Sequence, residues 1–349
     1  MTRRAFIKAA VCAGAGAALS GPVSAATADG RLMWAMLVHL GYNLWCDTIP
    51  RFWKNHQTPE LLKNRGVADH LRFDEKVWHR VSERMPGAGV NAVVIDIGEG
   101  LIYPSHPELA VKGSWTPEKL RSELDRLRAL GLEPIPKLNF STSHDAWLGP
   151  YGRMVSTPEY YRVCEDLISD VSDIFDSPRL FHLGYDEENA ENQSQYLYQV
   201  VRRGELWWHD FLLIEKLVER RGSRPWIWAD YYWNHPEEFE KRMPKSVLLS
   251  NWHYGEDFDL TDKNPVACRP NAYLRLEKAG FDQVPTASNS RGRQCLEKTI
   301  RLCRQNVDAK RLCGFMMTTW RKMTADFESV QDDALQIVHD ARAKIGDRT

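Results

Sequence analysis

Cysteine is scarce in this sequence, and its spacing points to neither a metal site nor a redox centre. Seven cysteines are scattered over 349 residues, and no two of them form a Cys-x-x-Cys pair. No His-x-x-x-His spacing indicates a zinc site either. We therefore predict that the protein uses no metal and no cofactor, and that its thiols are free and buried.

The chain also lacks an excess of charge of either sign. It has 46 lysines and arginines against 47 aspartates and glutamates, which gives a formal net charge of −1 at pH 7. A dedicated nucleic-acid-binding domain usually carries a basic face and a high pI. We therefore expect no nucleic-acid partner.

No apolar run is long enough to predict a comfortable membrane span. The run at residues 9–21 is short, is rich in Gly and Ala, and follows the paired arginines Arg3 and Arg4. This arrangement resembles a twin-arginine export signal, which is read by the export machinery and then removed. We predict that residues 1–28 are this signal, and that the mature chain is periplasmic or secreted without a stable membrane anchor.

After this segment, predicted strands and helices alternate eight times. Such alternation indicates parallel strands, because a crossover helix returns the chain to the same edge of the sheet. Eight units fit a single-domain α/β fold, a (β/α)8 TIM barrel over residues 29–349. A doubly wound sheet is the alternative, but no glycine-rich phosphate loop follows the first strand. The predicted strands lie within residues 32–42, 91–98, 133–141, 179–187, 224–233, 246–255, 283–290 and 312–320.

Adjacent carboxylates follow the fourth predicted strand, in the stretch LFHLGYDEEN at residues 180–189. Side chains alternate along a strand, so His182 and Asp186 are expected to point into the mouth of the barrel. Glu187 then lies at the rim, and Glu188 is expected to be a loop or helix-start charge. In such barrels the active site lies at the carboxyl ends of the strands.

Other strand ends add polar and aromatic side chains at the same end of the barrel. Flat indole rings stack on the apolar face of a sugar ring, and fixed polar groups bind its hydroxyls. The site is therefore predicted to bind a glycan, with Glu187 donating a proton to the glycosidic oxygen and Asp186 facing the anomeric carbon. The predicted sugar-binding residues are His39, Asn139, His182, Trp228, Asp230, Trp252, Tyr254 and Trp320.

The segment FHLGYDEE resembles the His-x-Gly-x-Asp-Glu motif of family 20 glycoside hydrolases, the β-N-acetylhexosaminidases. The resemblance implies that Glu187 is the general acid/base. It also implies that Asp186 orients the 2-acetamido group of the substrate, whose carbonyl oxygen acts as the nucleophile. The segment WIWAD is similar to the fifth-strand region of the family, and LLSNWHYGED is similar to the sixth. Tyr254 would then hydrogen-bond the acetamido carbonyl, and Trp320 would complete the pocket for the acetamido methyl group.

The sequence departs from the family pattern at both ends of the barrel. His39 and Asn43 stand in the first-strand region where the family usually has an arginine that binds sugar hydroxyls. The last strand runs into Arg321 and Lys322, where the family tends to have Trp-x-Glu. The basic replacement would suit a charged sugar.

The sequence thus predicts an exported glycosidase that releases a terminal β-linked N-acetylhexosamine. Two alternatives remain open at this stage. One is a carbohydrate-binding barrel without turnover. The other is a metal-dependent hydrolase with ligands from His144, Asp145, His182 and Asp186. The loop after the first strand, with Trp45, Phe52, Trp53 and His56, is expected to be a substrate lid or an ordered cover.

Overall fold

The computed structural model describes residues 31–47, 65–194, 196–261 and 263–346. The predicted export signal at residues 1–28 therefore lies outside the described residues, and so do Phe52, Trp53 and His56 of the predicted cover. Among the described residues, no helix is both long and apolar enough to cross a membrane.

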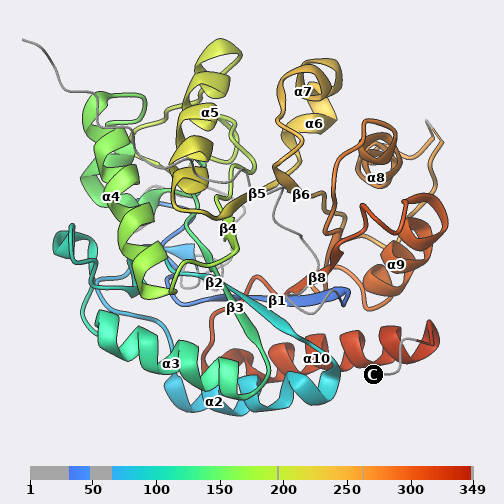
Figure 1. The fold of residues 1–349 in the computed structure, drawn as a ribbon, viewed down its shortest axis with the longest axis horizontal. Helices are drawn as coiled ribbons and strands as arrows, with labels where there is room; N and C mark the ends of the chain where they lie inside the picture. Colours follow the sequence, from blue (N-terminus) through green and yellow to red (C-terminus); the bar gives the residue numbers. More distant parts are fainter. Residues whose placement is uncertain (1–30, 48–64, 195, 262, 347–349) are drawn as a thin grey trace, which may run out of the picture.

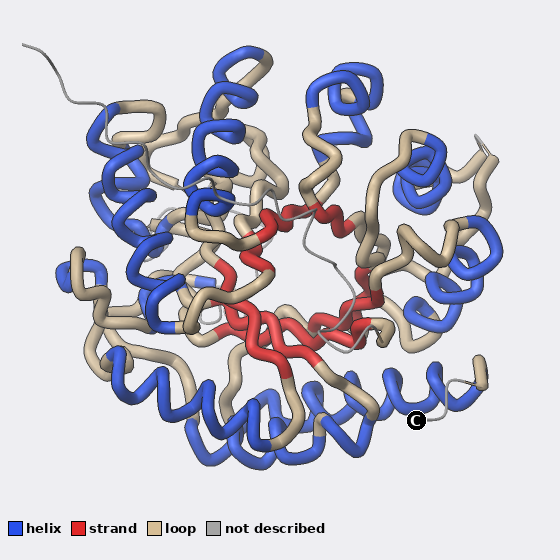
Figure 2. The backbone as a smooth tube through the Cα atoms, in the orientation of Figure 1, coloured by secondary structure: helices blue, strands red, loops and turns tan. Residues whose placement is uncertain are grey.

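Parallel strands form a ring, with the helices outside it (Figures 1 and 2). The strand order is β6-β5-β4-β3-β2-β1-β8-β7, and two bridges, Leu249 to Gln283 and Trp252 to Thr286, join β6 to the β7 side. The predicted (β/α)8 barrel is confirmed. The strands are β1 Met33–His39, β2 Ala92–Asp96, β3 Glu133–Lys137, β4 Leu180–His182, β5 Arg224–Trp228, β6 Leu248–Ser250, β7 Thr286–Ser288 and β8 Gly314–Thr318.

Two of the helices begin at a threonine that caps the first turn. Thr116 and Thr157 accept hydrogen bonds from backbone N–H groups in the first turns of α3 and α4, and a proline follows each of them. The helices are α2 Glu75–Arg84, α3 Pro117–Ala129, α4 Pro158–Ile174, α5 Glu205–Arg220, α6 Tyr231–Asn234, α7 Pro236–Arg242, α8 Cys268–Lys278, α9 Cys295–Asn306 and α10 Glu328–Lys344.

Alternation along the strands divides the apolar core into two parts. Met36, Val93 and Phe181 belong to the larger cluster, which the helices cover from outside. Ala35 and Trp226 belong to a second cluster inside the barrel. The helices thus bury the outer face of the strands, while the carboxyl ends of the strands carry polar groups.

Strand β4 is shorter than predicted. It ends at His182 rather than at residue 187, because Gly184 and Tyr185 adopt positive φ angles of 74° and 69°. Glu187 also has a positive φ, of 56°. Residues with side chains rarely adopt this conformation, and clusters of such backbone strain are typical of functional sites. Asp186 and Glu187 therefore lie on a tightly turned loop beyond the strand.

Candidate active site

A pocket of about 280 Å³ opens at the carboxyl ends of the strands. All of its lining residues follow strand ends or lie at the start of α8, as the (β/α)8 architecture requires. They are Trp45, Arg65, His144, Asp186, Glu187, Trp252, Tyr254, Arg269, Ser290, Arg291, Trp320 and Arg321.

Hydrogen bonds hold the backbone of the acidic pair from both sides. The Ser141 hydroxyl donates to the backbone carbonyl of Asp186, and the Ser143 hydroxyl donates to that of Glu187 at 2.7 Å. The Glu187 N–H donates to Oδ2 of Asp230 at 2.8 Å. Because β4 ends at His182, no strand pairing holds Asp186 and Glu187 in place. These hydrogen bonds take over that role and orient the two side chains.

Asn139 links the loop after β3 to the loop after β4. Its Nδ2 donates to Oδ1 of Asp186 at 2.9 Å, and its Oδ1 accepts from the N–H groups of Ser141 and Tyr185. A Cβ atom at Gly184 would lie only 1.9 Å from that Oδ1. Glycine is therefore needed at this position both for its positive φ and for the close approach of Asn139.

His144 contacts both members of the acidic pair. Its Nε2 lies 3.3 Å from Oδ2 of Asp186 and 3.4 Å from Oε2 of Glu187. Burial alone lowers the pKa of an imidazole, but the two carboxylates outweigh this effect and raise the pKa of His144 to about 10. At neutral pH His144 is therefore an imidazolium.

The two acids of the pair differ in exposure. Burial raises the pKa of the Asp186 carboxyl, but the charge of His144 outweighs burial and holds this pKa well below its usual range. Asp186 is buried and ionised, whereas the side chain of Glu187 is 37% exposed and reaches the pocket. One carboxylate is thus fixed in the wall, and its neighbour is accessible from the pocket.

Asp230 lies behind Glu187 and does not line the pocket. Burial and the nearby charge of Asp186 raise the pKa of Asp230 to about 7. Its Oδ1 lies 3.4 Å from the indole nitrogen of Trp252, which donates to it. Asp230 therefore orients both the acidic loop and one wall of the pocket.

Aromatic rings form the opposite wall. Tyr254 stacks on Trp252 with ring centroids 4.9 Å apart and an interplanar angle of 20°, and Trp320 lies 6.2 Å from Tyr254. Burial raises the pKa of Tyr254 well above its usual value, so its hydroxyl stays protonated and can donate a hydrogen bond.

Several predicted sugar-binding residues lie beneath the pocket instead of lining it. His182 packs against Trp228 with ring centroids 4.8 Å apart, and burial lowers the pKa of its imidazole. Trp228 in turn lies 5.9 Å from Trp320, and His39 lies 5.5 Å from the same ring. Together with Asn139, these residues support the pocket wall from below.

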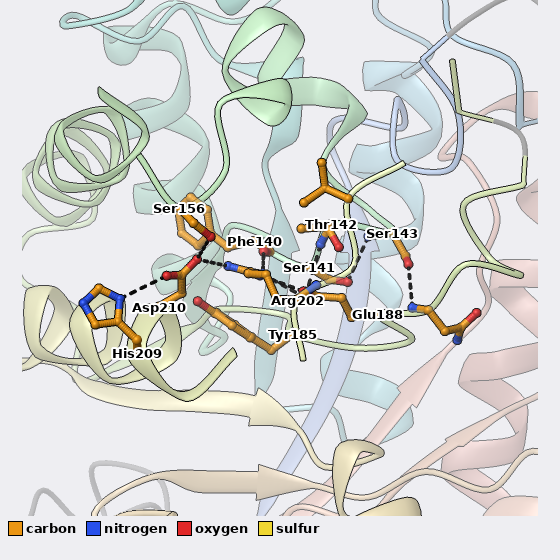
Figure 3. Close-up of polar contacts among 12 residues, drawn as sticks. Phe140, Ser141, Thr142, Ser143, Ser156, Tyr185, Glu188, Arg202, His209 and Asp210 are labelled. Carbon is orange, nitrogen blue, oxygen red and sulfur yellow. Dashed lines mark hydrogen bonds and ion pairs between the residues drawn. The ribbon is translucent and has the colours of Figure 1, made fainter. Parts of the chain in front are cut away.

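Glu188, expected to be a loop or helix-start charge, is instead the acid of a buried ion pair. Its two carboxylate oxygens accept from Nε and Nη2 of Arg202 at 2.6 and 2.8 Å. Arg202 also donates to Oδ2 of Asp210 on α5 and to the carbonyl oxygen of Phe140 (Figure 3). This network anchors the residue directly after Glu187 to the wall of the barrel.

One group of side chains has the geometry of a three-ligand metal site. Single ligand atoms of His144, Asp186 and Glu187 lie within 4.8 Å of one another. Among the residues that the structure describes, His182 and Asp145, named above as further ligands, do not belong to this group. The ligand set suggested by the sequence is therefore only partly brought together.

Sequence analysis missed most of the cationic lining of the pocket. Of the two basic residues after the last strand, Arg321 lines the pocket, whereas Lys322 is buried and approaches the ring of Phe327. Arg65, Arg269 and Arg291 lie on separate segments with no shared motif. Only the tertiary arrangement of the loops brings these three arginines together.

Solved structures of similar fold include proteins that act on amino sugars. A β-N-acetylhexosaminidase from Bacteroides fragilis aligns over 88% of this chain and 65% of its own, with a TM-score of 0.59 and 11% identity. Another β-N-acetylhexosaminidase aligns over 91% and 76%, with a TM-score of 0.60 and 13% identity. Dispersin B aligns over 90% and 99%, with a TM-score of 0.52 and 14% identity. This chain shares their fold.

The similarity to these proteins is found in the structure and not in the sequence. No family model matches the chain, and no curated protein matches it. The chain spans 65% of the Bacteroides fragilis protein and 50% of a chitobiase from Flavobacterium johnsoniae. At such low identity the comparisons establish the barrel fold alone, since one fold hosts many activities.

Proposed function

We propose that this protein is a glycoside hydrolase that releases a terminal β-linked N-acetylhexosamine, or a related 2-acetamido sugar, with retention of configuration. The observation that carries the proposal is the acidic pair. Asp186 is held ionised in the wall by Asn139 and His144, and the adjacent Glu187 reaches the pocket. The shared fold with β-N-acetylhexosaminidases supports the same conclusion as an analogy.

In the first step, Glu187 transfers its proton to the glycosidic oxygen as the bond to the anomeric carbon breaks. The carbonyl oxygen of the substrate's acetamido group attacks that carbon, so a cyclic intermediate forms without an enzyme nucleophile. Asp186 accepts a hydrogen bond from the acetamido N–H and stabilises the positive charge that develops there. The protonated hydroxyl of Tyr254 donates to the acetamido carbonyl and orients it for attack.

In the second step, the ionised Glu187 takes a proton from a water molecule that attacks the anomeric carbon. The bond to the acetamido oxygen breaks, and the sugar leaves with its original configuration. Trp252 and Trp320 supply apolar surface for the sugar and its acetamido methyl group, while Trp228, His182, His39 and Asp230 keep these groups in place. The predicted export from the cytoplasm belongs to the same proposal.

The first test replaces the acid and keeps its shape. Hydrolysis of aryl β-N-acetylglucosaminide and its galacto epimer should fall at least about a hundredfold in Glu187→Gln, because the proton donor is lost. Glu191→Gln, an exposed carboxylate on the same loop, is the matched control and should retain activity. Full activity in Glu187→Gln would overturn the assignment.

The second test examines whether the reaction needs the 2-acetamido group of the substrate. An aryl β-glucoside with a hydroxyl in place of the acetamido group should turn over far more slowly, since it carries no internal nucleophile. Comparable rates on both glycosides would point to an enzyme carboxylate as nucleophile instead.

A metal-dependent hydrolase is the second candidate, because His144, Asp186 and Glu187 have ligand atoms within 4.8 Å of one another. A metal ligand must give up its proton, and the raised pKa of His144 works against this. Incubation with a chelator, followed by dialysis, should leave glycosidase activity unchanged. A loss of activity that added Zn²⁺ or Mn²⁺ restores would favour this candidate.

A carbohydrate-binding barrel without turnover remains the third candidate. It predicts that 2-acetamido sugars bind with no hydrolysis, and that Glu187→Gln leaves their affinity unchanged. Calorimetry with the free sugar, beside the hydrolysis assay, separates this candidate from the enzyme.

A further inference from the structure

The pocket carries more positive charge than a neutral sugar needs. Four arginines line it, against the two acidic side chains Asp186 and Glu187. They are Arg65, Arg269, Arg291 and Arg321. By contrast, the whole chain has a formal net charge of −1, so this cationic lining is a local feature.

None of these four arginines forms an ion pair with a carboxylate within the described residues. The guanidinium of Arg321 donates to the backbone carbonyl of Trp320 at 3.1 Å and lies 5.7 Å from the ring centroid of Phe327. Arg291 and Arg321 are exposed at the mouth. Elsewhere on the molecule, exposed arginines such as Arg80 and Arg153 do pair with acids, at 2.6 Å in both cases. The guanidinium groups at the mouth are thus available to an incoming anion.

Arg269 is the most firmly held of the four. Its guanidinium lies over the rings of Trp233 and Trp252, 4.8 and 4.9 Å from their centroids. Its backbone carbonyl accepts from Nδ2 of Asn251 at 2.8 Å. Arg269 also lies in the first turn of α8, where the helix dipole disfavours a cation. The stacking therefore holds a guanidinium against the pocket wall at a position where the helix alone would favour an acid.

We infer that the pocket takes a 2-acetamido sugar that carries a sulfate or carboxylate group, or that is linked to a sugar carrying one. This inference rests on the proposed function and specifies its substrate class. Guanidinium groups bind both kinds of anion through paired hydrogen bonds, so the shared chemistry is an oxyanion at the arginine-lined mouth. Arg269 serves as the rigid anchor, and Arg291 and Arg321 complete the contact from the loops after β7 and β8.

The test compares matched neutral and anionic substrates. One pair is 4-nitrophenyl 2-acetamido-2-deoxy-β-glucopyranoside and its 6-sulfate. The other is a 2-acetamido sugar β-linked to glucose and the same sugar linked to glucuronic acid. At least one anionic member should have a kcat/KM about tenfold or more above that of its neutral partner, and the two pairs distinguish sulfate from carboxylate.

Variants then assign the preference to the arginines. The ratio of anionic to neutral kcat/KM should fall about tenfold or more in the Arg291→Gln/Arg321→Gln double variant. Arg269→Gln should lower the same ratio. The control Arg301→Gln removes an exposed arginine on α9 that does not line the pocket, and it should leave the ratio unchanged. Circular dichroism shows whether each variant is folded.

The outcomes separate this inference from the proposed function. Turnover of the neutral glycosides without any anionic preference, or with a ratio that the variants do not change, overturns the inference and leaves the glycosidase standing. No turnover, but calorimetric binding of the sulfated or uronic sugar that the double variant loses, supports the arginine site and removes the catalytic proposal. Neither turnover nor binding removes both.

Discussion

His144 is the residue that makes two adjacent carboxylates compatible with a buried wall. Without it, Asp186 would be a buried anion next to Glu187, and burial alone would raise the pKa of its carboxyl. The imidazolium instead compensates the charge at 3.3 Å from Asp186. The stability of the fold is therefore linked to the protonation of one histidine.

This linkage predicts a pH dependence of stability. The pKa of His144 rises from 6.5 to about 10 on folding, so the folded protein holds the proton more tightly. Protonated His144 therefore contributes on the order of a few kcal/mol to the free energy of unfolding. This contribution is fully present below pH 6.5 and is lost as the pH rises through 10. Urea unfolding between pH 6.5 and 10 measures it.

The control is His339→Asn, at an exposed position on α10. His144→Asn should be less stable than the wild type near neutral pH and should show a flatter pH profile, whereas His339→Asn should follow the wild type. Parallel profiles for His144→Asn and the wild type would contradict the prediction.

The contact between His144 and the acidic pair is a feature of the site that the sequence alone does not predict. The order of residues at the end of β4 predicted Asp186 and Glu187 as a pair. The sequence suggests His144 only as a metal ligand, because no local pattern joins it to that pair. Its contact depends on how the loops after β3 and β4 meet in space, and the bonds from Ser141 and Ser143 determine this.

At the scale of elements, residues with strong local preferences were predicted best. The Thr-Pro starts of α3 and α4 can be recognised in the sequence, because a capping side chain and a proline act within one turn. The end of β4 cannot, because Tyr185 and Glu187 have positive φ angles and donate their backbone N–H groups to residues distant in the sequence, Asn139 and Asp230. The alternation of side chains along the sequence therefore predicts an end of β4 that lies five residues beyond the observed one, at His182.

The loop after β4 depends on the buried network around Arg202. Replacing Arg202 by Met leaves Glu188 and Asp210 buried without their cation, and should cost about 3–5 kcal/mol in the free energy of unfolding. The proposed glycosidase activity should fall as well, since Glu188 adjoins Glu187. Urea unfolding and the aryl glycoside assay measure the two effects.

A double-mutant cycle tests whether the pair, rather than the volume of Arg202, is responsible. Combining Arg202→Met with Glu188→Gln should cost less than the sum of the single substitutions. The reason is that the double variant removes both charges of the Arg202–Glu188 pair, whereas each single variant leaves one of them buried without its partner. Arg301→Met, which breaks the exposed pair with Glu297, should cost less than about 1 kcal/mol. An additive cycle would assign the loss to packing instead.

At the scale of the whole molecule, the fold was predictable and the substrate was not. Eight strand–helix units specify a closed barrel almost independently of the residues at its mouth, which is why proteins with 11–14% identity share it. The cationic lining comes from loops after β1, β7 and β8 and from the start of α8, so no single stretch of sequence reveals it.

The balanced overall charge makes the last prediction specific to the pocket. Because the chain has a formal net charge of −1, it exerts no general attraction on anions, and any attraction arises from the arginines at the mouth. Salt screens such interactions, so kcat/KM for an anionic 2-acetamido substrate should fall about tenfold between about 0.02 and 0.5 M NaCl. The neutral partner should change little, and the Arg291→Gln/Arg321→Gln variant should lose most of the salt dependence. Equal salt dependence for both substrates would show that the arginines do not attract the substrate, even if the barrel is a glycosidase.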